Sequence, residues 1–110
     1  MAFTPYHNIT GSTGINIELI APGSDVGEIQ SIMIANTHAT ADATVSLFIQ
    51  NDPTAAAAST YYMLSTVAIP SDTSLLLDNS SVLSFDNSSS GYGLYLTVGA
   101  SDTLDVMINR

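Results

Sequence analysis

Three residue types that often carry chemistry are missing from this chain or nearly so. It has no cysteine, which excludes disulfides, zinc–thiolate sites and thiol catalysis. It has no tryptophan and no lysine, and its single arginine, Arg110, stands against ten acidic residues, so the net charge is −9. Because such a chain repels phosphate groups, we expect neither nucleic acid nor an anionic membrane surface as a partner.

Long apolar runs are also missing. No run approaches the ~20 residues that a membrane-spanning helix needs. The first five residues, Met1–Pro5, lack the basic and apolar regions of a signal peptide. We therefore expect a protein that is made in a cytoplasm and stays soluble until it meets its partner.

The composition is that of one folded domain. The chain has 110 residues, of which 45% are hydrophobic, enough for a core in a single domain over residues 1–110. Only 10% are charged, so the polar surface consists mainly of Ser, Thr and Asn. Such residues favour sheets and turns over exposed helices.

Short runs with the two-residue period of β-strands recur along the chain between turn clusters. The runs cover residues 15–19, 29–35, 44–49, 61–69, 75–77, 82–85, 92–98 and 104–108. This spacing predicts an all-β fold, an antiparallel β-sandwich of jelly-roll type with about eight short strands. Within it, we expect 29–35 to be a central strand buried on both faces, 55–58 to lie in a long loop and 99–102 to connect a hairpin.

No catalytic constellation is recognisable in the sequence. The two histidines, His7 and His38, lie near no Gly-x-Ser-x-Gly elbow, and both stand beside turn or strand-end residues. No pair of carboxylates is marked by apolar surroundings that would raise a pKa. We therefore expect a protein that is not an enzyme.

Calcium is the strongest of the chemical options. Asp72, Asp78 and Asp86 lie in predicted turns and would supply hard oxygen ligands if they met at one end of the sandwich. The alternative, which the sequence favours, is that these are solvated turn acids, since the EF-hand pattern is absent. No other cofactor is expected.

The distribution of charge favours a packing function. Most acids stand in predicted turns, which gather at the two ends of a sandwich and leave its flanks weakly charged. Weakly charged flanks cost little to desolvate, and interface cores are enriched in Tyr and Met. The candidate interface residues are Phe3, Tyr6, Tyr61, Tyr92 and Tyr95, with residues 1–6 as a candidate N-terminal arm.

The order of the segments resembles a family of small β-sandwich virion proteins of tailed bacteriophages. The matching segments are Leu19-Ile20-Ala21-Pro22-Gly23, Ile32-Met33-Ile34-Ala35-Asn36-Thr37, Ala43-Thr44-Val45-Ser46-Leu47-Phe48-Ile49, Tyr61-Tyr62-Met63-Leu64, Val67-Ala68-Ile69-Pro70, Ser74-Leu75-Leu76-Leu77, Leu94-Tyr95-Leu96 and Leu104-Asp105-Val106. The resemblance extends over roughly residues 15–109 and carries no catalytic signature.

This resemblance implies a structural component of a phage virion. The leading hypothesis is a head decoration or cement protein on the capsid exterior, bound where coat proteins meet. It would be made in the host cytoplasm and act as a homo-oligomer, such as a trimer, whose weak contacts add up. The alternatives are a tail, neck or fibre component, or a carbohydrate-binding module for host attachment.

Overall fold

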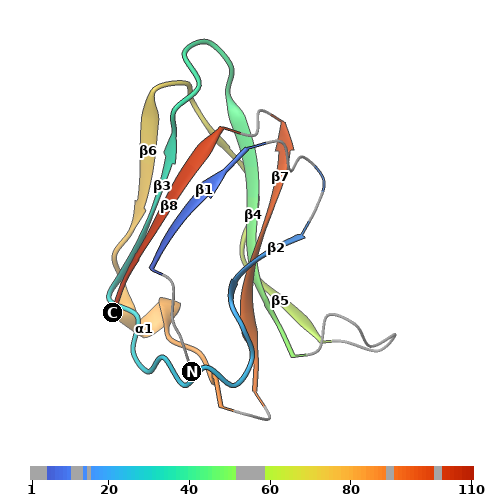
Figure 1. Cartoon of the computed structure of the whole chain (residues 1–110), viewed down its shortest axis with the longest axis vertical. Coiled ribbons are helices and arrows are strands. Elements are labelled where there is room, and N and C mark those ends of the chain that lie inside the picture. The colour runs from blue at the N-terminus through green and yellow to red at the C-terminus, as the bar shows by residue number, and fades with distance from the viewer. Residues whose placement is uncertain (1–4, 11–13, 15, 52–58, 89–90, 101–102) are drawn as a thin grey trace.

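The computed structural model describes residues 5–10, 14, 16–51, 59–88, 91–100 and 103–110. This part of the chain forms eight β-strands and one short helix (Figure 1). The elements are β1 (Tyr6–Ile9), β2 (Asn16–Ile20), β3 (Ser31–Asn36), β4 (Ala43–Gln50), β5 (Thr60–Ile69), β6 (Thr73–Leu77), α1 (Ser80–Leu83), β7 (Gly93–Ala100) and β8 (Leu104–Asn109). Phe3 and the stretch 55–58 lie outside the described residues.

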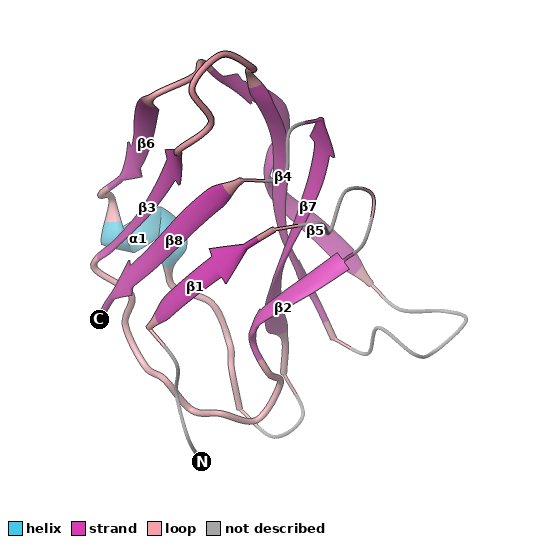
Figure 2. Cartoon of the chain, turned by 45° about the horizontal axis from the view of Figure 1, so that its top comes forward, coloured by secondary structure: helices cyan, strands magenta, loops and turns pink. Residues whose placement is uncertain are grey.

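The strands form two four-stranded antiparallel sheets, with the orders β1-β8-β3-β6 and β2-β7-β4-β5 (Figures 1 and 2). The chain passes from one sheet to the other at every connection between consecutive strands except the one from β4 to β5. Eight antiparallel strands in two sheets with this alternation make a jelly roll. The predicted fold class is confirmed.

The predicted hairpin between the last two strands is wrong. Strand β7 pairs with β2 and β4, whereas β8 pairs with β1 and β3 in the other sheet. Both strands alternate because each turns one side toward the same core, from opposite sides of it. A two-residue period predicts that one face of a strand is buried, but it does not predict which other strand pairs with it.

One hydrophobic core fills the space between the sheets. Its fully buried members come from the inner faces of both sheets and include Ile32, Ile34, Leu47, Leu96 and Val106. Each such side chain contributes roughly 1.5–3 kcal/mol by leaving water. The predicted burial of the 29–35 segment on both faces is wrong, because the exposure of β3 alternates along the strand. Its outward residues pack against no second layer among the described residues.

Two ends of the sandwich are each held by a buried asparagine. At one end Asn36, 1% exposed, donates from Nδ2 to the carbonyl oxygens of Ala41 (2.9 Å) and Ile69 (3.0 Å). Its Oδ1 accepts from the backbone N–H of His38 at 3.1 Å. The His38 Nδ1 in turn accepts the backbone N–H groups of residues 40 and 41, so this histidine organises a turn.

At the other end Asn87, 4% exposed, joins two loops. Its Nδ2 donates to the carbonyl oxygens of Ala21 (3.0 Å) and Tyr92 (2.7 Å), and its Oδ1 accepts from the N–H of Val26 (3.1 Å). Its own carbonyl accepts from the N–H of Asp25. All three side-chain hydrogen bonds go to backbone groups in loops, which do not take part in strand pairing. The buried amide is tolerated here because both it and these backbone groups have hydrogen-bond partners.

The run 82–85, predicted as a β-type segment, instead begins inside helix α1. Asn79 is the N-cap, and its Oδ1 accepts from the N–H of Ser81 at 3.2 Å. The tetrad Asp78–Ser81 is repeated in the sequence at 86–89. The first Asn of this pair caps a helix and the second is the buried Asn87, so the same residue types perform different local tasks.

Candidate interaction surfaces

The outer face of the first sheet carries a continuous line of apolar side chains. Tyr6 of β1 lies opposite Met107 of β8, Met107 lies opposite Met33 of β3, and Met33 lies opposite Leu76 of β6. Directly opposed residues share one face of a sheet, so these four residues form a row across all four strands, about 14 Å long at the usual strand spacing. We call Tyr6, Met107, Met33 and Leu76 the apolar row.

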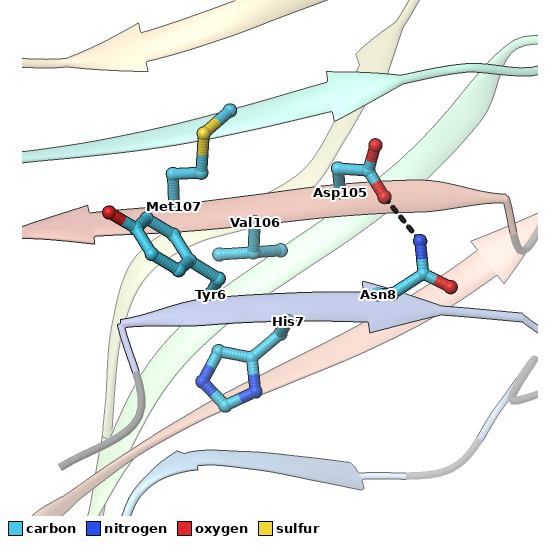
Figure 3. Close-up of a pocket in the computed structure, with 6 residues that line it drawn as sticks. All are labelled: Tyr6, His7, Asn8, Asp105, Val106 and Met107. Atoms are coloured by element: carbon cyan, nitrogen blue, oxygen red, sulfur yellow. Dashed lines mark hydrogen bonds between the residues drawn. The ribbon is translucent and has the colours of Figure 1, made fainter.

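The two ends of the apolar row are strongly exposed. The exposed fractions are 70% for Tyr6 and 56% for Leu76, and the two methionines between them are half-buried. Figure 3 shows Tyr6 and Met107 side by side on one side of the sheet, with His7 on the other. Tyr6 also borders a hollow of about 270 Å³. Exposed large apolar side chains in line with one another are a feature of interaction surfaces.

The surroundings of the apolar row are polar but nearly uncharged. Asp105 is the one charged residue among the outward-facing residues of these four strands, and its Oδ1 accepts from Asn8 Nδ2 at 2.6 Å. The remaining neighbours include Ser31, Ala35 and Ser74. Little charge must therefore be desolvated to cover this face.

The second sheet carries aromatic side chains on its outer face. Strand register places Tyr62, Phe48, Tyr95 and Glu18 in a line across β5, β4, β7 and β2. The ring of Phe48 lies 5.1 Å from that of Tyr62 and 6.0 Å from that of Tyr95, and the Tyr95 hydroxyl donates to Glu18 Oε2 at 3.3 Å. We call these three rings the aromatic cluster.

Only one ring of the aromatic cluster is open to solvent. Phe48 and Tyr95 are buried, whereas Tyr62 is 58% exposed. The Tyr95 ring reaches over Gly93, where an added Cβ would lie 2.9 Å from the Tyr95 hydroxyl oxygen and 2.6 Å from the carbonyl oxygen of Ile20. A glycine is therefore required at this place for the ring to pack.

The structure places the sequence-predicted interface tyrosines in three different environments. Tyr6 is exposed in the apolar row, while Tyr95 is buried and offers no free surface. Tyr61 is exposed beside the half-buried Tyr92, with ring centroids 5.9 Å apart. Burial and then the neighbouring Tyr61 raise the pKa of the Tyr92 hydroxyl. Phe3 lies outside the described residues.

The described part of the proposed arm, Pro5 and Tyr6, is already bound to the sheet. Tyr6 begins β1, and the carbonyl oxygen of Pro5 accepts from the N–H of Ile108 at 2.8 Å. Strand β1 was not predicted from the sequence. It has four residues, of which only Ile9 is buried, so its periodic signal is weak.

The three candidate calcium ligands do not come together. Asp72 and Asp78 flank β6 at its opposite ends, which places them roughly 20 Å apart along an extended strand. Asp86 lies in the loop after α1, where hydrogen bonds from Ser88 lower its pKa. Among the described residues, no group of three or more His, Asp or Glu side chains is placed to hold a metal ion.

Met33, Met107 and Leu76 were not predicted as interface residues from the sequence. Met33 was placed in a strand buried on both faces and Leu76 in a short apolar run, whereas Met107 was placed on the side of its strand opposite Leu104, Val106 and Ile108 but was given no function. The signal that identifies them is strict alternation, since every second residue of such a strand must point outward.

The geometry thus defines a jelly-roll β-sandwich with one exposed apolar row and one partly covered aromatic cluster. Comparisons with protein-family models, with curated proteins and with solved structures find no match. No helix among the described residues has the length and apolar character needed to cross a membrane.

Proposed function

We propose that this chain is a non-enzymatic structural protein of a phage virion, and specifically a decoration or cement protein that binds coat proteins on the capsid exterior. The observation that carries the proposal is the apolar row, which crosses a whole sheet without burying its two end residues. The order of the sequence segments resembles that of small phage virion proteins, and this resemblance is the reason for proposing a virion as the assembly that the protein joins.

The size of this face favours binding through several copies. Four strands at about 4.8 Å spacing and about 18 Å length cover roughly 350 Å². A typical stable interface buries about 800 Å² on each partner, so one sheet face is too small to hold a copy tightly. A homo-oligomer, such as a trimer, would place several apolar rows on neighbouring coat subunits and multiply weak contacts by avidity.

The charge distribution favours the exterior of the shell. The chain carries a net charge of −9, and most of its described acids lie in connections between strands, among them Asp25, Asp42, Asp72, Asp78 and Asp86, whereas Glu18 and Asp105 lie on strands. Packaged DNA would repel such a protein from the inner wall. On the outer wall, acidic end loops would keep particles from associating.

The test is binding of the purified chain to empty coat shells of the phage that encodes it. We expect saturation at a fixed number of copies per shell, measured by sedimentation and gel densitometry. The double substitution Tyr6→Ser with Leu76→Asn should lower the bound fraction at least tenfold. The matched control, Tyr62→Ser on the other sheet, should bind as the unmodified chain does. Equal binding by both variants would refute the apolar row as the contact surface.

Electron cryomicroscopy of the particle distinguishes the head from the tail. Density for the chain on the tail, neck or fibre would indicate that the apolar row binds a protein of that part of the virion and not the coat protein. Density between coat subunits supports the decoration function.

A carbohydrate-binding function for host attachment is the second candidate. The exposed ring of Tyr62, backed by the buried ring of Phe48, offers a single aromatic platform beside polar groups such as Gln50 and Thr60. Binding to a glycan array that is lost in Tyr62→Ala and kept in Leu76→Asn would favour this function. Absence of any glycan signal would remove it.

A further inference from the structure

The two edge strands of the second sheet, β2 and β5, are interrupted in ways that resist pairing with another strand. In the second sheet, β2 has a register shift between Glu18 and Ile20, and β5 has two, opposite Val45–Leu47 and Leu47–Phe48. Thr66 in that part of β5 has a φ of 55°, which turns the strand out of its regular path. Bulges of this kind are a common way to block edge-to-edge pairing.

The edge strand β6 has none of these protections. All five of its residues pair with β3 in unbroken register, and its sequence, Thr73-Ser74-Leu75-Leu76-Leu77, contains no charge, proline or glycine. Among the described residues β6 pairs with β3 alone. Figures 1 and 2 both show it at the margin of the sheet, with no described element along its outer side. Its free edge presents backbone groups that a further strand would satisfy.

The surroundings of β6 supply an anchoring place for an added strand. Beside its C-terminal end is a hollow of about 190 Å³ lined by residues of β6, of α1 and of the link between them, among them Leu76, Asn79 and Val82. Val82 is 62% exposed, unusually open for a valine next to an apolar edge. An apolar side chain of an added strand would cover Leu76 and Val82 together.

The charges at the two ends of β6 indicate which kind of strand would pair with its free edge. Asp72 precedes the strand and Asp78 follows it. If a second copy paired antiparallel through β6, Asp72 of each copy would approach Asp78 of the other, and two chains of net charge −9 would be joined at their acidic ends. Like charges at both ends oppose that pairing. A partner with basic residues at both ends of an apolar segment is complementary.

We propose that β6 accepts an extended segment of a partner protein as a fifth strand of its sheet, apolar at alternate positions and flanked by Lys or Arg. This inference rests on the proposed function and names the part of the partner that the chain recognises. Backbone hydrogen bonds along the edge would supply affinity, and the two aspartates and the hollow would supply register and specificity.

The test uses a seven-residue peptide in which Val and Thr alternate between two terminal lysines, titrated into the ¹⁵N-labelled full chain. We expect amide shifts concentrated on residues 73–78 and 82. A peptide with terminal glutamates in place of the lysines should bind at least tenfold more weakly. The lysine peptide with all five inner amides N-methylated has no edge that can donate to β6, and it should lose the β6 shifts.

Two variants of the chain separate pairing at β6 from general attraction to an acidic protein. The double substitution Asp72→Asn with Asp78→Asn should weaken the lysine peptide about fivefold, since two ion pairs at exposed sites are lost. The control, Glu28→Gln, removes an exposed carboxylate that belongs neither to β6 nor to the lining of the hollow beside it, and it should leave binding unchanged. Shifts centred on β1, β2 or β5, equal binding of the N-methylated peptide, or no binding at millimolar concentration would each overturn the proposal.

Hydrogen exchange in the shell complex separates this proposal from the proposed function. If the chain binds shells while the β6 amides exchange as in the free protein, the edge proposal fails and the virion function stands. If the peptide adds to β6 but the chain binds no virion component, the virion function fails and the edge remains a strand-binding site.

Discussion

Replacing Asn87 by alanine tests whether buried amides hold the ends of this sandwich. The substitution removes three side-chain hydrogen bonds, to Ala21, Val26 and Tyr92, without touching the hydrophobic core. The three backbone groups belong to two loops that no strand pairing holds together. The loops would have to separate enough to admit water, or leave those groups unsatisfied.

The expected loss follows from the number of bonds. Each contributes about 1 kcal/mol net, so Asn87→Ala should lower the free energy of unfolding by about 3 kcal/mol. At this chain length that corresponds to a fall of about 12 °C in Tm. Since small domains are stable by 5–15 kcal/mol, the variant should still fold, which keeps the measurement interpretable.

The assay is urea unfolding followed by far-ultraviolet circular dichroism, because the chain has no tryptophan for fluorescence. The matched control is Asn79→Ala, which removes an exposed N-cap and should cost about 1 kcal/mol. The reasoning is refuted if Asn87→Ala loses no more stability than Asn79→Ala. It would then follow that water replaces the buried amide at little cost.

Three further predictions concern the backbone and pH. Thr66→Gly should stabilise the fold by about 0.5–1 kcal/mol by relieving a left-handed backbone, whereas Thr60→Gly in regular strand should destabilise it, both measured by urea unfolding. Gly93→Ala should cost at least about 2 kcal/mol, because its Cβ would lie 2.6 Å from a carbonyl oxygen; an unchanged urea midpoint would contradict this. The pKa of Asp86 lies below the usual 3.8 because Ser88 donates to it, so its stabilisation is complete above that value and is lost as the pH falls through the lower folded-state pKa. Asp86→Asn should therefore flatten the acid dependence of the urea midpoint, and an unaltered slope would argue against this hydrogen bond.

Most strands were predictable because their periodicity is local. The alternating runs of β4, β7 and β8 locate each strand and its buried face. The run 82–85 was assigned wrongly because four apolar and polar residues fit a helical turn as well as a strand. Strand β1 was not predicted because it has a single buried residue, Ile9, and one residue cannot show a two-residue period of hydrophobicity.

Pairing between distant strands could not be predicted from the sequence. The link 99–102 is short enough for a hairpin, and only the positions of β2, β4, β1 and β3 place β7 and β8 in opposite sheets. The apolar row depends on the same long-range pairing. Tyr6 was predicted as an interface residue, but nothing local aligns it with Met33 or Leu76.

The pairing of β1 with β8 makes the apolar row depend on two strands that lie far apart in the sequence. Asn8 and Asp105, which are hydrogen-bonded to each other, are 97 positions apart in sequence. During synthesis on a ribosome, the Tyr6 end of the row has no neighbour until β8 has emerged, so the complete row forms only after β8 has been made. Non-local pairing of this kind also slows folding. Chains that stop before β8 therefore lack the full row, because Met107 and the pairing partner of Tyr6 are missing from them.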